Sequence, residues 1–174
     1  MNIQYILIIS FFIIAIFGTV FHFTHNWFKK GIILHLISAI NESTWEHMKL
    51  LIVPTILVTI FQYITVYSQY NNFWFSILTL LIIETLSIPL IFEPLRIYFK
   101  KVSLLFTITL FYLSIIIGLI FQYSVLVYEI SIISELLSMI LVILYISIYW
   151  IFTYYPPKLF IFKDPVYKRY GDIR

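Results

Sequence analysis

The chain of 174 residues has no cysteine and few charged residues of either sign. Without cysteine it can form no disulfide, no thiolate zinc site and no iron–sulfur cluster, so any bound metal ion would need His, Asp or Glu as ligands. Charged residues make up 11% of the chain, whereas a soluble domain averages about a quarter. With 62% hydrophobic residues, the chain cannot cover itself with a polar surface, and lipid must be the solvent for most of it.

The sequence patterns of several enzyme classes are also missing. There is no G-x-S-x-G nucleophile pattern, no Walker or dinucleotide-binding glycine pattern, and no H-E-x-x-H zinc pattern. The net charge of +3 is better explained by membrane topology than by nucleic-acid binding. We therefore expect the lipid bilayer as a partner and no nucleic acid. A second copy of the chain or another membrane protein is a further partner that the sequence allows.

Five apolar runs are long enough to cross a membrane as helices, since about 20 residues span the hydrocarbon core. The sequence therefore predicts an all-α, polytopic transmembrane helix bundle that forms a single membrane domain over 1–174. A shorter apolar segment at about 31–40 cannot span and is expected to be a re-entrant or interfacial helix. The expected spans are about 3–23, 44–69, 73–92, 102–123 and 130–155, followed by a tail at 156–174.

The basic residues lie on alternate loops. All eleven Lys and Arg residues fall in or beside the loop after the first span, the loop after the third span, and the tail. Because cytoplasmic loops are enriched in Lys and Arg, five spans place the N-terminus outside and the tail in the cytoplasm. The abundance of Ile, Phe, Tyr and Asn is typical of an AT-rich bacterial genome. We expect a multi-pass protein of a bacterial plasma membrane.

One short stretch, here called the motif loop (41–47), gathers polar side chains beside an apolar run. Its residues are Asn41, Glu42, Ser43, Thr44, Trp45, Glu46 and His47. Ser43 and Glu46 fit a capping box, in which Ser43 accepts a hydrogen bond from the N–H of Glu46 and the Glu46 carboxylate reaches back. The second span would then begin near Thr44. Glu42 and Glu46 are four residues apart and would share a face if both were helical.

Histidine gathers in the same part of the chain. His22 and His25 lie three residues apart near the end of the first span, and His35 lies in the short apolar segment. Histidine with carboxylate is typical of a metal or proton-transfer site. The alternative is structural: Glu46 caps a helix, Glu42 pairs with Lys29 or Lys49, and the histidines bond loop carbonyls. The candidate ligands for a divalent metal ion are His22, His25, Glu42, Glu46 and His47.

Glu84 lies near the middle of the third span. An ionised carboxylate at that depth is costly unless it is paired, so such residues usually face the bundle interior. It is either a proton or cation site, or a protonated residue bonded to a neighbour. The expected neighbours are Thr59 or Gln62 on the second span, or Ser114 on the fourth.

Three segments together resemble one family of small bacterial multi-pass membrane proteins, classed as a domain of unknown function. They are His22-Phe23 with Trp27; the motif loop with Met48-Lys49-Leu50; and Phe152-Thr153 with Pro156-Pro157, Phe162-Lys163-Asp164-Pro165 and Tyr170-Gly171. The N-E-S-x-W-E-H core is the most specific part, and the F-x-D-P-x4-Y-G tail supports it. The resemblance supplies no activity or cofactor. It implies that Asn41, Glu42, Trp45, Glu46, His47, Asp164 and Pro165 belong to one shared feature.

The motif loop and the tail are expected to dock together on the cytoplasmic face. The loop is acidic and the tail is basic, Asp164 would accept hydrogen bonds from His47 or from loop amides, and Trp45 would pack on a proline or a basic residue. The candidate polar site is thus Asn41, Glu42, Ser43, Trp45, Glu46, His47, Glu84 and Asp164.

Three functions fit these residues. The first is a small binding or transport-type module that uses the cytoplasmic His/Glu cluster and Glu84. The second is a membrane-embedded, metal-dependent hydrolase whose ligands and base come from the histidine-rich region. The third is a structural or accessory membrane subunit.

Overall fold

The computed structural model describes residues 2–28 (without the side chain of Asn26), 31–100 and 102–171. These residues form α-helices and two single-turn 3-10 helices, and no β-strand occurs among them. The all-α fold expected from the sequence is confirmed. In chain order the elements are α1 (Ile3–Trp27), α2 (Ile32–Ile37), α3 (Thr44–Val66), η1 (Tyr67–Gln69), α4 (Phe73–Phe99), α5 (Leu104–Val127), α6 (Glu135–Tyr154) and η2 (Phe160–Phe162).

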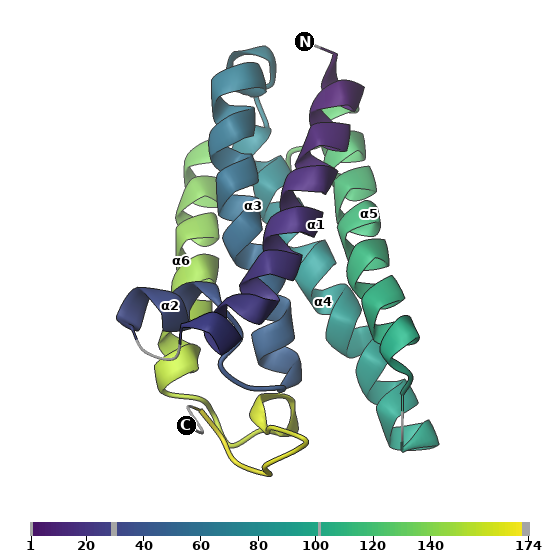
Figure 1. The fold of residues 1–174 in the computed structure, drawn as a ribbon. Coiled ribbons are helices and arrows are strands. Elements are labelled where there is room, and N and C mark those ends of the chain that lie inside the picture. Colours follow the sequence, from purple (N-terminus) through teal and green to yellow (C-terminus); the bar gives the residue numbers. More distant parts are fainter. Residues whose placement is uncertain (1, 29–30, 101, 172–174) are drawn as a thin grey trace.

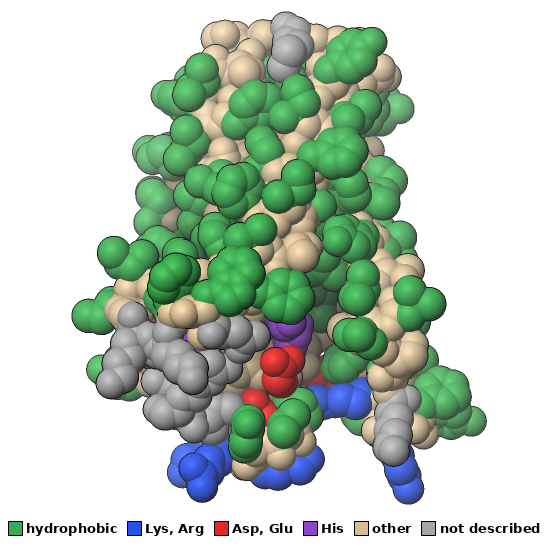
Figure 2. Space-filling view, viewed as in Figure 1, with side chains coloured by type: hydrophobic (Ala, Val, Ile, Leu, Met, Phe, Trp, Pro, Cys, Tyr) green, Lys and Arg blue, Asp and Glu red, His purple; other side chains and the backbone are tan. Residues whose placement is uncertain are grey.

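Five elements are long and apolar enough to cross a membrane: α1, α3 with η1, α4, α5 and α6. Their candidate spans cover 20 to 27 residues, which matches the roughly 20 residues that a bilayer requires. Figure 2 shows apolar side chains over most of the visible surface, and Lys and Arg gathered at its lower end. The six-residue α2 is too short to span, so the short helix expected within 31–40 is also confirmed.

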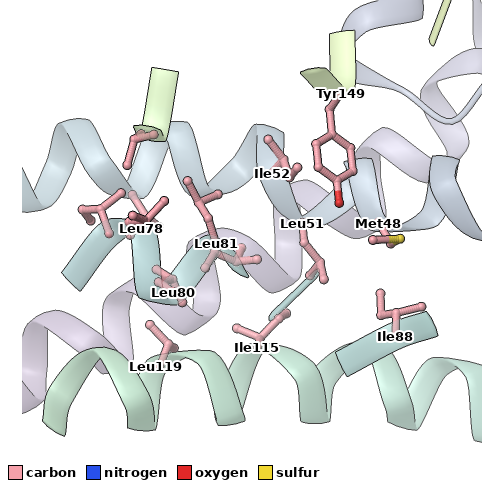
Figure 3. Packing of buried hydrophobic residues seen from close by; sticks show 14 of the residues in the cluster. Met48, Leu51, Ile52, Leu78, Leu80, Leu81, Ile88, Ile115, Leu119 and Tyr149 are labelled. Atoms are coloured by element: carbon pink, nitrogen blue, oxygen red, sulfur yellow. The ribbon is translucent and has the colours of Figure 1, made fainter. Parts of the chain in front are cut away.

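Helices α3 and α4 lie at the centre of the bundle. Helix α1 packs on α3 and α5, while α5 and α6 both pack on α4. Buried side chains from three helices, such as Leu51, Leu81 and Ile115, interlock in the core (Figure 3). The N-terminus lies at one end of the bundle and residues 156–171 at the other (Figure 1). The latter end, where α1 finishes and α3 begins, is called the tail end below.

Serine side chains set where three of the helices begin. Ser43, Ser103 and Ser134 each accept a hydrogen bond from the backbone N–H three residues later, at 3.2–3.3 Å. Such N-caps satisfy a backbone donor that has no partner within the helix. The cap at Ser134 explains why α6 begins at Glu135, although the apolar run that predicts this span begins near 130.

Helix α1 approaches α3 closely at Gly18. A Cβ atom at Gly18 would lie 2.8 Å from the backbone oxygen of Leu50 and 2.6 Å from a ring carbon of Phe111. Leu50 is four residues before Pro54, and a proline inside a helix has no N–H to bond that carbonyl. Gly18 thus packs directly on the Leu50 carbonyl, which Pro54 leaves without its helical hydrogen bond. One helical turn beyond Gly18, the same approach brings His22 over the beginning of α3.

Candidate metal centre

The motif loop and the tail are in direct contact, as the sequence predicts. The Asn41 side-chain amide donates to the carbonyl of Gly171 at 2.9 Å, and the N–H of Glu42 donates to Asp164 Oδ2 at 2.9 Å. Asp164 is completely buried, and its Oδ1 accepts from the N–H groups of Val166 and Tyr167. The expectation that Asp164 accepts from loop amides is therefore confirmed, whereas His47 is not its partner.

Trp45 anchors this docking through aromatic contacts. Its ring stacks on Tyr149 at 4.0 Å between centroids and lies 4.4 Å from the ring of Phe162. The prediction of a proline or a basic residue on this ring is wrong. The reason is that α6 and η2 place apolar rings on both sides, which removes the Trp45 ring from water without burying a charge.

Glu46 is a structural residue in this arrangement. Ser43 accepts from its N–H, so the first half of the capping box is confirmed. The second half is wrong, because the N–H of Ser43 donates to Asn41 Oδ1 instead. The Glu46 carboxylate accepts from the N–H of Ile40 and pairs with Lys49 at 2.6 Å. An acid held by a buried cation is not free to bind a metal ion.

Three of the predicted metal ligands do converge. One ligand atom each from His22, Glu42 and His47 lies within 4.8 Å of the other two. His47 Nε2 is 3.6 Å from Glu42 Oε2, and the ring centroids of His22 and His47 are 5.4 Å apart. These residues come from α1, the motif loop and α3, and we call them the His22–Glu42–His47 cluster. The helix begins only at Thr44, so Glu42 and Glu46 do not share a helical face.

The hydrogen bonds of the two imidazoles suit metal binding. His47 Nδ1 lies 2.9 Å from the carbonyl oxygen of Ser43. A carbonyl can only accept, so Nδ1 carries a proton, and Nε2 is the ring nitrogen that faces Glu42. Metal-binding histidines usually donate their second N–H in this way. His22 Nδ1 is buried and has no hydrogen-bond partner among the described residues.

The remaining predicted metal ligand, His25, lies outside the cluster. Its ring is buried against the ring of His35, 5.3 Å away, and His35 in turn stacks on Tyr154. Positions 22 and 25 lie on neighbouring faces of α1, but the His25 ring contacts α2, whereas the His22 ring contacts His47. Together with Glu46, His25 is removed from the predicted ligand set.

Glu84 has a partner on α3, but not one that was predicted. Thr55 Oγ1 donates to Glu84 Oε1 at 2.7 Å, and both side chains are fully buried. Thr59 bonds the carbonyl of Thr55, and Gln62 bonds Gln122 and Ser10. Ser114 likewise bonds within α5. The interior orientation was predicted correctly, whereas the pairing depends on the register between helices.

A small cavity of about 90 Å³ borders the cluster. Glu42 and His47 contribute to its wall, together with Thr44, Arg96 and Pro165 from the surrounding elements. Figure 2 shows His and acidic side chains side by side at the lower edge of the apolar surface. The rest of the lining is Ile88, Phe92, Thr107, Leu110 and Phe111.

The buried Glu93 orients two of the cavity's polar side chains. The Thr44 hydroxyl donates to Glu93 Oε1, and Arg96 Nη2 lies 2.7 Å from Glu93 Oε2. Sequence reasoning missed Glu93. Its only signal is the i,i+3 spacing to Arg96, since Thr44 is 49 positions away in the chain.

Residues 1–172 match the model of a family of unknown function, DUF6512. The chain belongs to this family. No curated protein and no solved structure gave a match. The matched range contains the helices, the motif loop and the tail up to Gly171.

The donor set of this DUF6512 chain fits a divalent transition metal ion. Two imidazoles and one carboxylate are the ligand types found in catalytic zinc sites, which keep one position open. Ligand atoms at about 2.1 Å around a tetrahedral ion are roughly 3.4 Å apart. The Glu42–His47 separation of 3.6 Å already meets that value. Glu42 is the most exposed of the three residues, so its side chain has room to adjust around an ion.

Proposed function

We propose that this protein binds a divalent metal ion through His22, Glu42 and His47 and acts as a metal-dependent hydrolase at the membrane surface. The observation that carries the proposal is the hydrogen bond from His47 Nδ1 to the Ser43 carbonyl. It turns Nε2 toward the other two ligands, in a set whose ligand atoms lie within 4.8 Å of one another.

The chemistry that a bound ion supplies is activation of a water molecule and polarisation of a substrate oxygen. The chain's own residues have distinct parts in this proposal. Asp164 holds the backbone at Glu42, and Ser43 fixes the tautomer of His47. The cavity beside the cluster gives a substrate a place next to the open coordination position.

We propose further that the tail end of the bundle is cytoplasmic and that the membrane is a bacterial plasma membrane. The support is the distribution of charge, since Lys and Arg gather at this end of the molecule (Figure 2), as they do in cytoplasmic loops. A metal site there would draw on cytoplasmic metal ions and act on molecules at the inner leaflet.

Metal titration of the purified protein tests the proposal. The full chain in detergent is stripped with a chelator, titrated with Zn²⁺ or Mn²⁺, and assayed by calorimetry and elemental analysis. We expect about one ion per chain. His22→Asn, Glu42→Gln and His47→Asn should each weaken binding about 10-fold to 100-fold or more.

The matched controls are His35→Asn and Glu84→Gln, which remove the same residue types outside the cluster. Both should bind metal as the unsubstituted chain does. A folded protein that takes up no ion would overturn the proposal and favour a structural or accessory subunit, in which docking of the loop and the tail is the purpose of the motif.

A second candidate function is a cation- or proton-binding module of the transport type, in which Glu84 takes part. It is favoured by one observation: Glu84 Oε2 is buried without a hydrogen-bond partner among the described residues. Such intramembrane acids often mark ion pathways. In the same titration, loss of binding in Glu84→Gln with no loss in the cluster variants would select this function.

A further inference from the structure

The cavity beside the cluster is polar at one end and apolar at the other. On α4 its wall consists of Ile88, Phe92 and Arg96, which are spaced four residues apart and so lie on one helical face. Eight residues of helix correspond to about 12 Å, so Arg96 lies much nearer to the tail end than Ile88 does. Glu42 and His47 lie near the tail end as well, whereas Leu110 of α5 faces the apolar part.

Arg96 is held in place by its neighbours, but some of its N–H donors have no partner in these contacts. One of its nitrogens pairs with Glu93, and its guanidinium lies 5.8 Å from the ring centre of Phe92. A guanidinium has five N–H donors in a rigid plane, which suits a two-point contact with a phosphate or carboxylate. The Arg96 side chain retains 25% of its exposure, so donors remain available to a ligand in the cavity.

The charge around the cavity depends on the metal ion. Without it, Glu42 and Glu93 outnumber Arg96, and an anion would be repelled. With a divalent ion on the cluster the balance becomes positive, and both the ion and Arg96 attract a negative group. An anionic ligand is therefore expected only in the metal-loaded protein.

The walls extend from the cavity onto a surface that faces lipid. The volume of about 90 Å³ accommodates a small headgroup and no acyl chain. Leu104 and Ile108 of α5 are exposed, and each lies three residues before a cavity residue, Thr107 or Phe111, on the same side of the helix. Figure 2 shows the surface hollowed between the part that carries the His and acidic side chains and the outer limb formed by the ends of α4 and α5.

We infer that the cavity binds the negatively charged headgroup of a phospholipid, with the acyl chains lying along α5, and that this lipid is the substrate class of the site. This inference rests on the proposed function, because the metal ion supplies the excess positive charge. Arg96 is the headgroup-binding residue, and Thr107 forms part of the wall where headgroup and chain meet.

Lipid titration of the full chain tests the inference. Zn²⁺-loaded protein in detergent is titrated by calorimetry with a short-chain phosphatidic acid, with the matching phosphatidylcholine, and with inorganic phosphate. We expect saturable binding of phosphatidic acid, at least about tenfold tighter than either other ligand. The same titration on chelator-stripped protein should show this preference lost.

Three variants and one control identify the residues that bind the lipid. Arg96→Gln should weaken binding of phosphatidic acid about tenfold or more, and Arg96→Lys, which keeps the pair with Glu93, should give a smaller loss. Thr107→Phe should block the lipid while leaving the metal affinity unchanged. Arg169→Gln removes an exposed arginine outside the cavity and should have no effect.

The outcomes separate the inference from the proposed function. Loss of metal binding in the cluster variants with no preference for phosphatidic acid overturns the lipid inference alone. Equal binding of inorganic phosphate, unaffected by Thr107→Phe, also overturns it and assigns the cavity to a free oxyanion. Absence of metal binding overturns both.

Discussion

Lys49 is a fully buried lysine at the membrane surface, and all three of its donors are used. It pairs with Glu46 at 2.6 Å, donates to the carbonyl of His35 at 2.7 Å and to Thr153 Oγ1 at 3.3 Å. These partners lie on α3, α2 and α6. A single ammonium group thus joins three elements at the tail end. It also holds the Glu46 carboxylate apart from the His22–Glu42–His47 cluster.

Replacement of Lys49 by methionine should destabilise the protein by about 3–5 kcal/mol, because it leaves the Glu46 carboxylate buried without its partner. Denaturant unfolding in detergent measures the change. Lys49→Met/Glu46→Gln should recover part of the loss, and Lys163→Met, at an exposed lysine, should be near neutral. If Lys49→Met were as stable as the unsubstituted chain, this account of the ion pair would be contradicted.

Among the helices, the contact of α1 with α3 decides whether the His22–Glu42–His47 cluster can form. This contact brings His22, on α1, close to Glu42 and His47 at the beginning of α3. It depends on the absence of a side chain at Gly18. The backbone oxygen of Leu50 cannot move aside as the end of a flexible side chain would. A larger residue at this position must therefore push the two helices apart.

Gly18→Ala should lower the free energy of unfolding by about 1–3 kcal/mol, as overpacking of a tight contact does. It should also weaken metal binding, since His22 moves with α1. Unfolding and metal titration of the same preparation measure both effects. Val20→Ala, on the exposed side of α1, is the matched control. Loss of stability with unchanged metal affinity would show that the contact does not position His22.

The five long helices and the short α2 could be predicted because each depends on a local run of apolar residues and on the bilayer thickness. Docking of the tail on the motif loop followed from topology, which placed both at one face. The start of α6 was harder, because a single cap at Ser134 overrides the apolar run before it.

The candidate site was only partly predictable, because its pairings depend on how the helices are rotated and aligned. Three of five metal candidates converge. His25 packs against His35 of α2 instead, and Glu46 pairs with Lys49. The Thr44–Glu93 and Thr55–Glu84 pairs join separate helices. Composition and spacing along the sequence do not determine the register between two helices, and so do not determine which of their residues are in contact.

For the whole molecule, the five long helices cross from one end of the bundle to the other, so the start of α1 and the tail lie at opposite ends (Figure 1). With the positive charge inside, Asn71→Cys and Glu129→Cys should react with an impermeant maleimide on intact cells. Lys100→Cys and Arg169→Cys should react only after permeabilisation. The chain has no native thiol, so the unsubstituted protein is the blank. Labelling of Lys100→Cys on intact cells would refute this orientation.

The docking of loop and tail means that the support of the cluster is synthesised only after all five long helices. Asp164 and Gly171, which hold Glu42 and Asn41, lie 122 and 130 positions after these partners and follow α6 in the chain. A chain interrupted after α6 would contain all five long helices but lack the groups that position the Glu42 backbone. In such a chain the Glu42 backbone would lack the hydrogen bond that holds it beside His22 and His47, so the tail couples the order of synthesis to the order of the site.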